Sequence, residues 1–211
     1  MTRALIIVDV QNDFCTGGPL ETGRGSEVAS LISGYLQTHH AAYDVVVTTQ
    51  DWHIDPGAHF SDKPDFKNSW PVHCIADTAG SALHPDLETD YVEAYFRKGE
   101  YEAAYSGFEG LLAPEESVMT GEHEPGQMPE DTLKVSLDDW LQEQDVTDVD
   151  IVGIATDYCV RATALDAVDA GYETRVLVDL TAPVAEDSAE AAIEELEDAG
   201  VDVIDSSSVG R

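Results

Sequence analysis

The N-terminal sequence reads Ala4-Leu5-Ile6-Ile7-Val8-Asp9, an uninterrupted apolar run that ends at a carboxylate. A strand without polar alternation has both faces buried, which is typical of a parallel sheet covered by helices. Because the run stops at Asp9, we expect this carboxylate to lie at the C-terminal end of a central strand, the edge where such sheets bind ligands.

Strand and helix patterns alternate along the rest of the chain. They predict strands over residues 45–49, 94–96, 149–154, 175–178 and 201–204, and helices over residues 26–40, 158–170 and 186–199. We expect Ser26 to cap the first helix, and Gly171 and Gly200 to end the other two. The alternation predicts a three-layer α/β/α fold, with a mostly parallel central sheet of about six strands and helices on both faces.

Length and charge limit the classes of function. The 211 residues, 43% of them hydrophobic, predict one domain over residues 1–211, with an acidic loop insertion at 115–132. A formal net charge of -33 disfavours binding to nucleic acid or anionic membranes.

No early apolar run is long enough for a signal sequence or membrane span, so we expect a cytoplasmic protein. Acidic residues are spread over the whole chain, which favours a salt-rich cytoplasm over an ordinary acidic protein.

The three cysteines, Cys15, Cys74 and Cys159, are an odd number, which predicts free thiols. Cys159 lies where a predicted strand turns into a helix, and the positive end of a helix dipole lowers the pKa of a thiol. Asp9 and Lys98 follow other strands, so they are candidates for the proton acceptor and the charge partner. Taken singly, the three could be a buried apolar residue, a turn-capping carboxylate and a surface charge. Their common sheet edge favours a catalytic group.

A second group of side chains follows the strand predicted at 45–49. It supplies one carboxylate and three imidazoles, from Asp51, His53, His59 and His73. This donor set suits one divalent transition metal ion, with zinc, iron(II) and manganese all compatible. The alternative is a polar loop whose histidines make ordinary hydrogen bonds. The number of ligands on one loop favours the metal site.

Five segments together resemble the nicotinamidase/pyrazinamidase family of the isochorismatase-like hydrolases. They are Asp9-Val10-Gln11-Asn12-Asp13-Phe14, residues 51–59, Lys98-Gly99, residues 104–108 and residues 153–160. The resemblance implies hydrolysis of nicotinamide, and also of pyrazinamide, through a cysteine thioester in NAD salvage. It also implies that the protein forms homo-oligomers, as is common in the family.

The resemblance assigns roles to the same residues that the pattern singled out. It implies a catalytic triad of Asp9, Lys98 and Cys159, and a metal ion, most often zinc, held by Asp51, His53, His59 and His73. It further implies an oxyanion hole from the backbone N–H groups of Ala155 and Cys159, next to a cis peptide between Ile154 and Ala155. The substrate pocket would be lined by Phe14, Trp70 and Tyr105.

Two features depart from the family pattern. Tyr158 stands where relatives often have histidine, and the acidic segment 115–132 is longer than usual.

The sequence leaves three alternative functions: an amidase for carbamoyl or ureido substrates, a vinyl ether hydrolase of the isochorismatase type, and a non-catalytic metal-binding domain. The presence of Cys159 together with the loop that contains one aspartate and three histidines favours a nicotinamidase.

Overall fold

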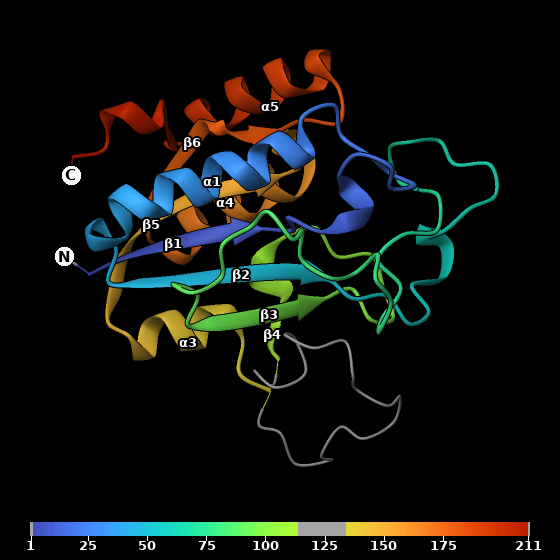
Figure 1. Ribbon diagram of the computed structural model, residues 1–211, viewed down its shortest axis with the longest axis horizontal. Coiled ribbons are helices and arrows are strands. Elements are labelled where there is room, and N and C mark those ends of the chain that lie inside the picture. Colours follow the sequence, from blue (N-terminus) through green and yellow to red (C-terminus); the bar gives the residue numbers. More distant parts are fainter. Residues whose placement is uncertain (1, 114–133, 211) are drawn as a thin grey trace.

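The computed structural model describes residues 2–113 and 134–210. Their sheet has the order β4-β3-β2-β1-β5-β6-β7, and all neighbours are parallel except the antiparallel pair β3 and β4 (Figure 1). The strands are β1 (Thr2–Val8), β2 (Val45–Asp51), β3 (Ala94–Lys98), β4 (Leu111–Leu112), β5 (Val146–Ile154), β6 (Glu173–Ala182) and β7 (Asp202–Ile204). The predicted α/β class is therefore confirmed, with β1 at the centre of the sheet.

Helices cover both faces of the sheet. They are α1 (Gly25–His39), α3 (Leu137–Glu143), α4 (Arg161–Ala170) and α5 (Glu186–Asp198). Leu5 and Ile7 of β1 pack with the α1 side of the core, whereas Ile6 packs with the side formed by the other three helices. All three side chains are fully buried. The apolar run at residues 4–8 is thus explained, since its alternate residues enter two different cores.

Several predicted details are wrong. Ser26 does not cap α1: the cap is Arg24, without a side-chain hydrogen bond, and the Ser26 hydroxyl instead accepts the Thr16 N–H at 3.1 Å. The helix expected at 158–170 begins as a short π-helical turn, Thr156–Val160, before α4 starts. Gly171 does end α4, in the left-handed conformation. Within residues 2–113 and 134–210, no helix has both the length and the apolar character needed to span a bilayer.

The sequence interpretation also missed two short elements. Strand β4 has only two residues, too few to show a periodic pattern, and it makes the described sheet seven-stranded. Helix α3 has seven residues, buries Leu137 and Leu141 one turn apart, and is capped by Ser136, whose hydroxyl accepts the Asp139 N–H. The acidic insertion expected at 115–132 lies outside the described residues.

The strand register gathers the candidate residues at one edge. Val8 pairs with Thr49 of β2 and with Gly153 of β5, and Asp51 pairs with Lys98 across β2 and β3. The carboxyl ends of these strands therefore point to the same side of the sheet, where the long connecting loops lie (Figure 1). Asp9 continues from β1 in a left-handed conformation, φ 49°, which turns the chain at this edge.

Gly153 is required for the close approach of β1 and β5. Its φ is +115°, and a Cβ atom at this position would lie 2.1 Å from the Val8 carbonyl oxygen. Gly171 is a matched control, because its φ is +96° but a Cβ atom there would meet nothing within 4 Å. Strain alone should cost Gly171→Ala about 1 kcal/mol of unfolding free energy, and the clash should cost Gly153→Ala a further ~1–3 kcal/mol.

Urea unfolding at fixed salt concentration measures both values. Equal losses in the two variants would show that the β1–β5 approach tolerates a side chain, and would contradict the requirement for glycine at this position.

Candidate active site

A buried lysine lies at the centre of the site. Lys98 ends β3, and its side chain is fully shielded from solvent. Its Nζ lies 2.8 Å from Asp9 Oδ2, donates to Asp51 Oδ1 and to the Ala104 carbonyl oxygen at 3.2 Å, and lies 3.7 Å from Cys159 Sγ. The structure therefore brings together the three residues that the sequence predicted as a triad, and it adds Asp51 as a fourth member.

Burial and charge set the protonation of this group. Burial alone would lower the pKa of Lys98, but the Asp51 and Asp9 carboxylates hold it well above its usual range. Burial would raise the pKa of Asp51, but the Lys98 ammonium holds it well below its usual range. The lysine and Asp51 thus form a buried ion pair.

For the nucleophile and its expected base, burial outweighs the charge of Lys98. Burial raises the pKa of the Cys159 thiol well above its usual range, although Lys98 opposes this. The predicted lowering by a helix dipole is therefore wrong for the resting site, because loss of hydration outweighs it. Burial also raises the pKa of Asp9, again opposed by Lys98. Oxygens of Asp9 and Asp51 lie within 4.8 Å of each other and of Cys159 Sγ, so a proton can pass from the thiol to Asp9 locally.

Three buried imidazoles lie next to this group. His53, His59 and His73 each present a ring nitrogen within 4.8 Å of the others. His53 Nδ1 is hydrogen-bonded to the Gly99 carbonyl at 2.6 Å and His73 Nδ1 to the Pro71 carbonyl at 2.7 Å, which leaves both Nε2 atoms as free donors of an electron pair. Those Nε2 atoms lie 3.6 and 3.8 Å from Asp51 Oδ2.

The residues fit a divalent metal ion. Among the described residues, His53 Nε2 and His59 Nδ1 are buried without a hydrogen-bond partner, which an ordinary polar loop would not leave. Burial, together with the neighbouring imidazoles, lowers the pKa of His59 to about 4, so this ring is neutral at physiological pH, as a metal ligand must be. The Asp51 carboxylate lies beside the imidazoles of His53 and His73 and also contacts Lys98, so it joins the two halves of the site.

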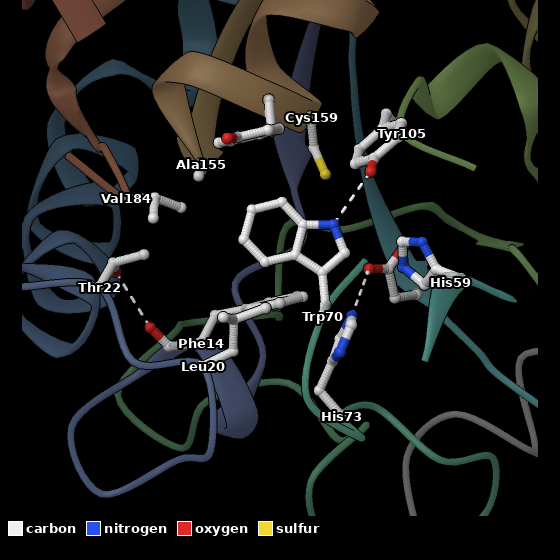
Figure 2. A pocket seen from close by; sticks show the side chains of 12 residues that line it. Phe14, Leu20, Thr22, His59, Trp70, His73, Tyr105, Ala155, Cys159 and Val184 are labelled. Atoms are coloured by element: carbon white, nitrogen blue, oxygen red, sulfur yellow. Dashed lines mark hydrogen bonds and ion pairs between the residues drawn. The ribbon is translucent and has the colours of Figure 1, made fainter. Parts of the chain in front are cut away.

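A pocket opens onto Cys159 and two of the three imidazoles, those of His59 and His73 (Figure 2). All three predicted substrate-binding aromatics line it, and the Trp70 indole N–H donates to the Tyr105 hydroxyl at 3.0 Å. The Ile154–Ala155 peptide is cis, as the resemblance implied, and Ala155 lies in the pocket wall. Asp9, His53 and Lys98 do not line the pocket. Four lining residues were not predicted as site residues, namely Leu20, Thr22, Tyr158 and Val184.

Gln11 is the most informative residue that the sequence interpretation missed. Its buried amide accepts the Asp51 N–H and donates to the Asp51 carbonyl oxygen, both at 2.8 Å, and it also donates to the Ser81 carbonyl oxygen at 2.8 Å. Gln11 therefore hydrogen-bonds both backbone groups of Asp51, its N–H and its carbonyl oxygen. The sequence analysis included Gln11 in the segment from Asp9 to Phe14 that resembles the family, but gave it no role.

The turn that carries Cys159 is fixed in a similar way. The buried Asp157 carboxylate accepts the N–H groups of Val184 at 2.9 Å and Ala185 at 3.2 Å. This pair of bonds ties the turn to the segment that contributes Val184 to the pocket wall. Thr163 donates to the Cys159 carbonyl oxygen at 2.6 Å and accepts the Gly107 N–H at 2.8 Å, which links the turn to the loop that carries Tyr105.

The fold and the site together define a parallel α/β protein with a buried Asp-Lys-Cys group beside a candidate metal centre. The isochorismatase domain model matches residues 3–117 and 131–208, so the chain belongs to the isochorismatase family. It is 50% identical to the nicotinamidase/pyrazinamidase of Mycobacterium tuberculosis over 97% of this chain and 100% of that protein.

Two solved structures extend the similarity. A protein of L. infantum in complex with nicotinate matches with a TM-score of 0.78 and 30% identity, covering 99% of this chain and 95% of that one. A pyrazinamidase of Pyrococcus horikoshii in complex with zinc matches with a TM-score of 0.76 and 31% identity, covering 97% and 99% respectively.

The contacts of Gln11 predict a role in metal binding. Gln11→Met removes all three hydrogen bonds and leaves the Asp51 backbone unsupported. Gln50→Met is the matched control, since Gln50 is also buried and donates to the same Ser81 carbonyl oxygen, at 2.9 Å. We expect Gln11→Met to weaken zinc binding by about tenfold or more and Gln50→Met to change it by less than about twofold.

Competition with a chromophoric chelator measures the zinc dissociation constants, and thermal unfolding of the metal-free variants reports general destabilisation. Equal weakening of zinc binding in the two variants would argue against a specific role for Gln11.

Proposed function

We propose that the protein is a nicotinamidase that hydrolyses nicotinamide, and also pyrazinamide, with Cys159 as its nucleophile, as a step of NAD salvage. The observation that carries the proposal is the position of the Cys159 thiol. It contacts the buried Lys98 ammonium and also lies in the wall of an aromatic pocket that reaches the imidazole group. The names of the M. tuberculosis relative and the nicotinate complex of the L. infantum protein support this substrate class.

In the first half of the reaction, Asp9 takes the proton of the Cys159 thiol, and the sulfur attacks the carboxamide carbon of the substrate. The raised pKa of Asp9 suits it to hold this proton. The Lys98 ammonium, 3.7 Å from the sulfur, stabilises the negative charge on the sulfur as it develops. The N–H groups of Ala155 and Cys159 are the proposed donors to the oxyanion of the tetrahedral intermediate.

In the second half, the C–N bond breaks and Asp9 gives its proton to the leaving nitrogen, so that ammonia departs and a thioester remains on Cys159. Asp9 then takes a proton from a water molecule, which attacks the thioester carbon and releases nicotinate. The proton returns from Asp9 to the Cys159 sulfur. Thr49 keeps Asp9 in place throughout, because its hydroxyl donates to Asp9 Oδ1 at 2.7 Å.

Asp51, His53, His59 and His73 are the proposed ligands of the metal ion. We propose zinc, with iron or manganese as alternatives, since the P. horikoshii pyrazinamidase was solved in complex with zinc. A divalent ion held by these residues would supply a Lewis acid for the pyridine nitrogen of the substrate. Phe14, Trp70 and Tyr105 enclose the flat ring from the other sides of the pocket.

The cysteines provide a direct test of the nucleophile. Cys159→Ala should lower the rate of ammonia release from nicotinamide by at least about a thousandfold, because the covalent route is lost. Cys15→Ala is the control, since Cys15 is also a buried free thiol but does not line the pocket. Assays in molar potassium chloride screen the repulsion expected from the net charge of -33.

Ammonia release that persists in folded Cys159→Ala would exclude the mechanism. If the wild-type, metal-loaded protein released no ammonia from nicotinamide, the substrate assignment would fail and carbamoyl and ureido compounds would be tested next.

Metal removal tests the other half of the site. We expect a chelator-treated sample to lose ammonia release and to regain it when zinc, manganese or iron(II) is added, because the substrate ring loses its anchor. His53→Ala should bind zinc at least about tenfold more weakly, whereas His84→Ala, outside the imidazole group, should bind it as the wild type does. Full activity in a demonstrably metal-free sample would contradict the assignment.

A further inference from the structure

Tyr158 joins two parts of the chain across the pocket. It directly precedes Cys159 in the π-helical turn, and its side chain lines the pocket. Its hydroxyl donates to the carbonyl oxygen of Phe66 at 3.1 Å, although the two residues are 92 positions apart in the sequence. The turn that carries the nucleophile is therefore bonded to the loop that leads to Trp70, which itself lines the pocket.

The loop that receives this bond is a closed turn. Asp65 Oδ1 accepts the N–H groups of Lys67, Asn68 and Ser69 at 2.8–2.9 Å, and the Phe66 N–H donates to the Ser69 carbonyl oxygen at 3.1 Å. Phe66 itself has a left-handed conformation, φ 55°. These bonds leave the Phe66 carbonyl in a defined direction, so Tyr158 meets a preformed acceptor.

The rings of Phe66 and Tyr158 both contact the ring of Trp70. The Tyr158 and Trp70 rings lie edge to face with centroids 4.9 Å apart, and the Phe66 and Trp70 rings do so at 6.2 Å. The Trp70 indole N–H is held by the Tyr105 hydroxyl on a further side (Figure 2). Within residues 2–113 and 134–210, Trp70 thus contacts the rings of Phe66 and Tyr158 and the hydroxyl of Tyr105, and Tyr158 is also hydrogen-bonded to the loop that carries Phe66.

We propose that Tyr158 determines the size of ring that the pocket admits, by holding the segment from Phe66 to Trp70 against the turn of Cys159. This inference rests on the proposed amidase function. With the bond in place, the wall formed by Tyr158 and Trp70 limits substrates to single six-membered heteroaromatic amides. A fused bicyclic amide such as quinoline-3-carboxamide needs this wall to move or to lose a side chain.

Two variants separate the bond from the bulk of the ring. Tyr158→Phe keeps the ring and removes the hydrogen bond, so KM for nicotinamide should rise about threefold to tenfold while kcat changes by less than about twofold. Tyr158→Ala also removes the wall, so the ratio of kcat/KM for quinoline-3-carboxamide to that for nicotinamide should rise by at least about tenfold. Tyr101→Phe and Tyr101→Ala are the controls, because Tyr101 is 66% exposed and does not line the pocket, and they should leave both quantities unchanged.

Amide hydrogen exchange over residues 61–69 tests the bond without substrate. Exchange should be faster in Tyr158→Phe than in the wild type or in Tyr101→Phe. An unchanged substrate ratio in Tyr158→Ala would overturn the proposal, as would unchanged exchange together with unchanged KM in Tyr158→Phe. A wild-type protein inactive on nicotinamide would instead contradict the proposed function, and the exchange measurement would still decide whether the bond holds the loop.

Discussion

The site depends on one buried cation. An isolated ammonium group without water is strongly disfavoured, and Lys98 is stable only because two carboxylates, Asp9 and Asp51, lie against it. Removing either carboxylate would leave an uncompensated buried charge, at a cost of about 3–5 kcal/mol. The same ammonium contacts the Cys159 sulfur, so the charge balance that stabilises the core also prepares the nucleophile. Asp51 extends this balance to the imidazoles, which makes the two halves of the site one electrostatic unit.

The sheet makes this arrangement possible. Parallel pairing places Asp9, Asp51 and Lys98 at the ends of three adjacent strands, and the close approach at Gly153 brings in the turn of Cys159 from a fourth. Side-chain amides and carboxylates then hold backbone segments that no strand holds. Gln11 does so for Asp51, and Asp157 does so for the turn. The positions of the reacting atoms are therefore set by hydrogen bonds to the main chain as well as by the strands.

Local pattern was enough to predict much of this architecture. The apolar run before Asp9 predicted a central parallel strand, and residue type with spacing predicted the cysteine and imidazole groups. The hydrogen bonds of Gln11 and of Tyr158 could not be predicted, because each joins residues 40 or more positions apart through side-chain geometry. The pKa of Cys159 was predicted in the wrong direction, since position at a helix start is visible in a sequence but depth of burial is not. Elements as short as α3 and β4 leave too few residues for a period to be read.

The central claim is that the buried cation prepares Cys159 to form a thioester. Partitioning between water and hydroxylamine tests it most directly. The wild-type, metal-loaded protein is incubated with nicotinamide and increasing hydroxylamine, and ammonia, nicotinate and nicotinohydroxamate are quantified together. A thioester predicts that hydroxamate replaces nicotinate as hydroxylamine rises, with the sum of the two equal to the ammonia released. Ammonia accompanied by nicotinate alone at every hydroxylamine concentration would mean direct attack by water, and would contradict the role of Cys159 as the nucleophile.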